Sequence, residues 1–69
     1  MWTLIWGMEV NRILKTWNRE TSSTLDEAMQ SAAEKMNNGY VAHAVISPEG
    51  IVHFDEATIK EKLRGGAKP

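Results

Sequence analysis

Two histidines, His43 and His53, are the residues of this 69-residue chain whose type and spacing best suit chemistry. Both fall in segments that read as neighbouring strands, on the same face and one diagonal step apart, where long side chains can meet. Asp55, or an acidic residue of a second subunit, could complete a His/His/carboxylate metal site. Because no clear third ligand accompanies the two histidines, a metal-binding domain is an alternative hypothesis, and half-buried histidines on a pleated surface are the simpler interpretation.

The usual patterns of catalytic residues do not occur in the sequence. There is no cysteine, which excludes a thiolate nucleophile and a cysteine zinc site. Ser22 and Ser23 precede a predicted helix and are explained as helix-entry residues. Gly65-Gly66 follows a helix, whereas a phosphate-binding loop opens one. No pair of carboxylates has grounds for a general acid/base role. We therefore expect no enzymatic activity and no cofactor.

Three tryptophans, Trp2, Trp6 and Trp17, lie in the first quarter of the chain. Single-stranded nucleic acids stack on such residues, but their binding sites also need a positively charged groove. The chain has a net charge of −1, and the basic residues near the tryptophans are confined to positions 12–19. Since aromatic residues are enriched at subunit interfaces, we interpret the tryptophans as part of the core or of an interface, with single-stranded nucleic-acid binding as a further alternative.

The most clearly specified element is a helix predicted over 24–38. Its apolar residues recur at helical spacing, namely Leu25, Ala28, Met29, Ala32, Ala33 and Met36. Thr24 and Glu27 fit a capping box, and Gly39 fits the left-handed position after a helix. A shorter helix is predicted over 55–64 with Asp55 as its N-cap, followed by a disordered tail over 65–69.

Residues 40–54 predict a β-hairpin. Ser47-Pro48-Glu49-Gly50 fits a type I turn followed by a left-handed glycine. If Ser47 lies opposite Ile51, then Ile46 pairs with Val52, and strict alternation divides the hairpin into two faces. One face carries Ala42, Ala44, Ile46, Val52 and Phe54, and the other carries Val41, His43, Val45, Ile51 and His53.

The beginning of the chain is best read as two strands, over 2–8 and 12–18. Alternate residues from Trp2 to Met8 are apolar, and β-branched and aromatic residues are frequent. The alternative is one strand followed by a helix over 8–19. The preferred interpretation gives a small two-layer α+β domain with the order β-β-α-β-β-α and an antiparallel sheet covered by one main helix, whereas the alternative gives β-α-α-β-β-α.

A single domain over 1–64 has a small core, because a chain of this length buries only about 60% of its unfolded surface. The main helix can cover one sheet face, which leaves an apolar face for a partner. The residues predicted at this interface are Trp2, Trp6, Trp17, Val41, Val45 and Ile51. We predict a protein-interaction module that forms a homodimer or binds another protein.

No stretch approaches the roughly 20 apolar residues of a membrane span, and the N-terminus has no positively charged leader. We therefore expect a cytoplasmic protein with no membrane partner.

Overall fold

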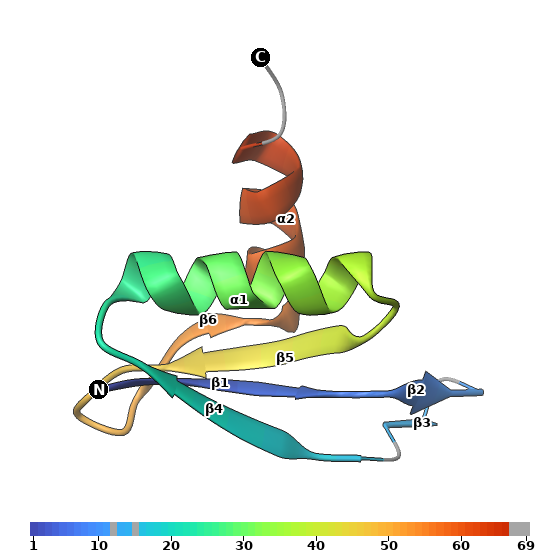
Figure 1. Cartoon of the computed structure of the whole chain (residues 1–69), viewed down its shortest axis with the longest axis horizontal. Helices are drawn as coiled ribbons and strands as arrows, with labels where there is room; N and C mark the ends of the chain where they lie inside the picture. Colours follow the sequence, from blue (N-terminus) through green and yellow to red (C-terminus); the bar gives the residue numbers. More distant parts are fainter. Residues whose placement is uncertain (12, 15, 67–69) are drawn as a thin grey trace.

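The computed structural model describes residues 1–11, 13–14 and 16–66 (Figure 1). The elements in chain order are β1 (Trp2–Gly7), β2 (Glu9–Val10), β3 (Ile13–Leu14), β4 (Asn18–Ser22), α1 (Leu25–Asn37), β5 (Val41–Ile46), β6 (Val52–Asp55) and α2 (Glu56–Gly66). Four strands form one antiparallel sheet in the order β4-β1-β5-β6, and β2 pairs with β3 in a separate ribbon. The predicted small α+β fold, with an antiparallel sheet and one main helix packed on it, is confirmed.

The described part of the first 22 residues forms the strands β1 to β4 and contains no helix, so the alternative helix over 8–19 is wrong. The second long strand is also displaced from its predicted position at 12–18, because β4 pairs with β1 from Asn18, opposite Trp6, to Ser22, opposite Trp2. Between β1 and β4 the chain forms the β2–β3 ribbon, in which Asn11 has a φ of 53°. Asparagine tolerates this left-handed conformation better than most residues. We call the segment from Met8 to Trp17 the arm.

Helix α1 confirms the predicted capping chemistry. The Thr24 hydroxyl accepts a hydrogen bond from the Glu27 backbone N–H at 3.1 Å, and a Glu27 carboxylate oxygen accepts one from the Thr24 N–H at 3.2 Å. The helix ends before Gly39, whose φ of 88° suits glycine. Helix α1 lies across one face of the sheet, which we call the helix face; the opposite side is the open face (Figure 1).

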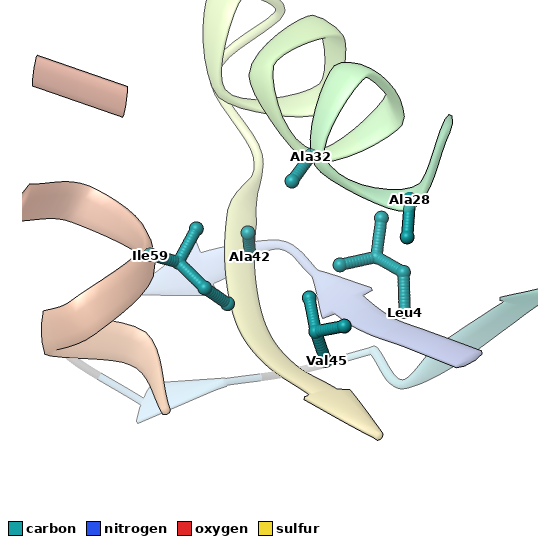
Figure 2. Packing of buried hydrophobic residues seen from close by; sticks show 6 residues of the cluster. All are labelled: Leu4, Ala28, Ala32, Ala42, Val45 and Ile59. Atoms are coloured by element: carbon teal, nitrogen blue, oxygen red, sulfur yellow. The ribbon is translucent and has the colours of Figure 1, made fainter. Parts of the chain in front are cut away.

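A small core lies between the helix face and the two helices. Its fully buried members are Leu4, Ala28, Ala32, Ala42, Val45 and Ile59 (Figure 2). The alanines of α1 and β5 have no bulk beyond Cβ, so the helix backbone can approach the sheet closely. Larger side chains, including those of Trp2, Trp6 and Met29, are partly buried around this centre. The apolar stripe predicted for the main helix therefore forms one wall of the core.

The turn between β5 and β6 is the predicted one. The Gly50 N–H donates to the Ser47 carbonyl at 2.9 Å, and Gly50 has a φ of 86°. Ile46 pairs with Val52, as the sequence predicts. The predicted register therefore holds at the turn.

Two irregularities make the predicted faces of this hairpin wrong farther from the turn. In β6 the register shifts after Val52, so that Val45 pairs with Phe54 and His53 is the extra residue. In β5 the register with β1 shifts in the same way at His43. Each extra residue moves the following side chains to the other face. The shift at His43 therefore places Val45 on the same face as Ala42, where it is fully buried in the core, although the sequence predicted it on the face away from the helix.

Helix α2 begins where predicted, because an Asp55 carboxylate oxygen accepts a hydrogen bond from the Thr58 N–H at 2.8 Å. It extends to Gly66, two residues past the predicted end at 64, and the remainder of the predicted tail, 67–69, lies outside the described residues. Ile59 carries α2 into the core on the helix face. Within the described residues, neither helix has the length and apolarity needed to cross a bilayer.

Candidate protein-interaction site

The open face of the sheet carries a groove with a volume of about 550 Å³. Its position follows from strand register. Leu4 is buried on the helix face, so its neighbour Ile5 points to the open face, and Ile5 pairs with Arg19 on β4 and with Ala44 on β5. The groove is lined by Ile5, Trp17, Asn18, Arg19, His43, Ala44, Ile46 and Val52. Side chains from all four sheet strands and from the arm thus meet on this face.

The groove has an apolar floor and an exposed apolar rim. Ile5 and Ala44 form the floor and are covered by their neighbours in the sheet. At the rim, Val52 is 55% exposed and Trp17 is 57% exposed. Covering large apolar side chains that are this exposed with another surface lowers the free energy. The arrangement can therefore bind an apolar surface.

One end of the groove is polar as well as aromatic. The Trp17 and His43 rings meet edge to face, with centroids 4.7 Å apart and planes at 85°. Nδ1 of His43 lies 3.6 Å from Oε1 of Glu56, and Oε2 of Glu56 is 3.1 Å from Nζ of Lys60. Edge-to-face aromatic pairs contribute about 0.5–1.5 kcal/mol beyond area burial, so the contact with His43 favours this position of the Trp17 ring at the rim.

The other two tryptophans lie on the helix face, where they cover the core. Trp2 and Trp6 both pack against the core residues. The Trp6 and Tyr40 rings meet edge to face with their centroids 5.0 Å apart. Nζ of Lys35 lies 4.8 Å from the centroid of the Trp6 ring. These contacts give Trp2 and Trp6 a structural role. Of the three tryptophans predicted at an interface, Trp17 is the one that lines the groove.

The three aliphatic residues of the predicted interface also separate. Val45 is fully buried, which removes it from any surface of the folded chain. Val41 is half-buried and pairs with Gly7 at the end of β1. Ile51 is 66% exposed beside the β5–β6 turn and stays available to a partner. Sequence reasoning missed Ile46 and Val52 as open-face residues, because the alternation pattern contains no signal for the two register shifts.

The two histidines do not come together as the sequence predicted. His43 contacts Trp17 on the open face, whereas the His53 ring lies 5.1 Å from that of Trp2 and 4.4 Å from that of Phe54. Trp2 and Phe54 both pack against the core from the helix face. In the part of the chain that the structure describes, no three His, Cys, Asp or Glu residues are placed to hold a metal ion together.

A polar cluster on the helix face joins β4 to α1. The Ser31 hydroxyl donates a hydrogen bond to Glu20, and Nζ of Lys35 lies 3.2 Å from the Glu20 carboxylate. The bond from Ser31, followed by the contacts with Lys35, lowers the pKa of Glu20 below its ordinary value. This cluster explains why β4 contacts the helix without apolar residues, and its partners are all within the fold.

On the helix face, the described apolar side chains pack into the core, whereas the open face carries the apolar floor and rim of the groove. At the end of the groove, Glu56 contacts both His43 and Lys60, whereas the floor and part of the rim are apolar. Comparison of the chain with known protein families, with functionally described proteins and with solved structures gave no match.

Proposed function

We propose that this chain is a small protein-interaction module that self-associates through the open face of its sheet. The observation that carries the proposal is the groove on that face, with Ile5 and Ala44 as its floor and Val52 and Trp17 exposed at its rim. Within the described residues, both helices pack on the other side of the sheet. Apolar surface of this kind is typical of interaction sites.

The small core of the molecule favours a second copy of the chain as the partner. Three of the six fully buried core residues are alanines, so the core buries few large side chains. A domain of this size gains only about 3–5 kcal/mol from such a core, and oligomerisation is a common supplement. Two sheets packed face to face, about 10 Å apart, would enclose a second apolar layer.

A nucleic-acid strand is a less suitable partner for this face. Sheets that bind single strands present several aromatic platforms together with positive charge. Among the lining residues that the structure describes, Trp17 is the one tryptophan and Arg19 is the one lysine or arginine. The net charge of the chain is −1. These observations favour an apolar protein partner.

The test is the molar mass in solution, measured by size-exclusion chromatography with light scattering from low to high micromolar concentration. We expect the mass to rise toward twice that of the monomer. Val52→Lys places a charge on the rim of the groove and should weaken association at least about tenfold, which corresponds to about 1.4 kcal/mol. Gln30→Lys adds the same charge to the exposed side of α1 and should leave association unchanged.

A wild-type chain that remains a strict monomer at high micromolar concentration would refute the proposal. Equal weakening by Val52→Lys and Gln30→Lys would show that the association uses another surface. A parallel titration with a single-stranded oligonucleotide should leave the tryptophan fluorescence unchanged. Saturable quenching in that titration, without a dimer, would replace a protein partner with a nucleic acid.

A further inference from the structure

Among the side chains that the structure describes, the large exposed apolar ones fall into two groups, apart from Met1 at the terminus. The arm carries Met8, Val10, Ile13 and Trp17, and the β5–β6 turn region carries Ile51 and Val52. Strand register places the two groups at opposite ends of the sheet. Gly7, which precedes the arm, pairs with Val41, whereas Thr3, at the other end of β1, pairs with Ile46, which precedes the turn. Figure 1 shows the β2–β3 ribbon and the turn at opposite ends.

Few backbone contacts join the described residues of the arm to one another. Its ribbon contains two pairs, Glu9 with Leu14 and Val10 with Ile13, and the Met8 N–H donates to the Thr16 hydroxyl at 3.1 Å. Val10 is 41% exposed and Ile13 is 58% exposed. A two-stranded hairpin is marginally stable in water unless another element covers it. A surface that covers Val10 and Ile13 would therefore stabilise the arm as well as bind it.

We infer that the two copies of the proposed dimer pack with their strands antiparallel across the interface, so that the arm of each copy covers the turn region of the other. This inference rests on the proposed function. In a two-fold dimer, a contact between two different regions forms twice, once in each direction. The two-fold axis then lies in the plane between the two sheets and runs perpendicular to the strands. Ile5 and Ala44, near the middle of the face, meet their own counterparts in the second copy, and both exposed groups are covered.

Charge favours this arrangement over one in which the arms meet each other. The sequence of the arm contains two basic residues and one acidic residue, Glu9, whereas the turn contains Glu49 and no basic residue. Arm against arm would bring two segments with the same excess charge together. Arm against turn brings segments of opposite excess charge together, which raises the association rate and specifies the orientation.

Cross-linking can read the orientation directly, because the chain has no cysteine and a single introduced cysteine is unique. The variants are Ile13→Cys on the arm and Ile51→Cys beside the turn, both at exposed positions. One variant is labelled with ¹⁵N, so that a mixed dimer has its own mass, and the mixture is treated with a short bismaleimide. Gln30→Cys on the exposed side of α1 is the matched control.

We expect an Ile13–Ile51 cross-link as the main dimeric product, several-fold more abundant than either homodimeric product or any product with Gln30→Cys. If Ile13→Cys weakens the dimer while circular dichroism shows a folded chain, Val10→Cys takes its place, because Val10 pairs with Ile13. A dominant Ile13–Ile13 product would overturn the inference and leave self-association standing. A dimer by light scattering with no Ile13–Ile51 or Val10–Ile51 product would also overturn it, and a strict monomer would refute the proposed function itself.

Discussion

Replacement of Val45 by alanine tests whether this residue belongs to the core or to an interface. Val45 is fully buried between the sheet and the helices. Val45→Ala removes two methyl groups, which costs about 1.6 kcal/mol of transfer free energy. A residual cavity of up to about 50 Å³ adds up to about 1 kcal/mol at about 24 cal/mol per Å³. We therefore expect a loss of about 2–3 kcal/mol in the free energy of unfolding.

A loss of this size is large for a domain whose core supplies only about 3–5 kcal/mol. The midpoint of thermal unfolding should fall by about 10–20 °C, since 1 kcal/mol corresponds to about 4–8 °C at this size. Urea unfolding, followed by far-ultraviolet circular dichroism, measures the free energy. It must be done at a concentration where the chain is monomeric, because association adds apparent stability.

Val52→Ala is the matched control, because it makes the same chemical change at a residue that is 55% exposed. Its cost in the monomer should stay within about 0.5 kcal/mol, as is usual for surface positions. A loss below about 1 kcal/mol for Val45→Ala, or an equal loss for both variants, would refute the placement of Val45 on the helix face.

Three further changes test other parts of the fold. Thr24→Ala removes the N-cap of α1 and should cost about 1 kcal/mol by urea unfolding, whereas Thr24→Ser should preserve most of the stability. Gly50→Ala meets no atom within 4 Å, so its expected loss of about 1 kcal/mol comes from the φ of +86° alone, and no loss would contradict that turn conformation. The contacts of Glu20 lower its pKa in the folded chain, so the stability that they add is fully present above the ordinary pKa of 4.5 and is lost as the pH falls through the lower, folded-state pKa. Glu20→Gln removes this titration and should flatten that part of the curve of unfolding free energy against pH. An unchanged curve would contradict the contacts of Glu20 with Ser31 and Lys35.

The elements that the sequence predicted well are those whose chemistry is local. Thr24 and Glu27 satisfy the first turn of α1 through bonds within four residues, and no distant residue is needed to place them. Ser47 and Gly50 specify the β5–β6 turn in the same way. Such positions can be read from the sequence because the partners of each polar group are neighbours in the chain.

Strand β4 was placed wrongly because its sequence, Asn18–Ser22, contains no apolar residue. An edge strand needs none when the helix above it supplies polar partners, and here Glu20 meets Ser31 and Lys35 on α1. That compensation involves residues eleven or more positions away, which no local pattern reports. The apolar residues of the arm, by contrast, were the reason for predicting a strand over 12–18, although they lie beyond the main sheet.

The candidate site was only partly predictable, and the two histidines explain why. Each is the extra residue at a register shift, His43 in β5 and His53 in β6. Without the shift at His43, Ala44 would share the core face with Ala42, and Val45 would lie on the open face. Without the shift at His53, Val52 would share the core face with Phe54 instead of lining the groove. The two histidines that first suggested metal chemistry therefore mark the register shifts of β5 and β6, and these shifts decide which side chains the open face presents to a partner.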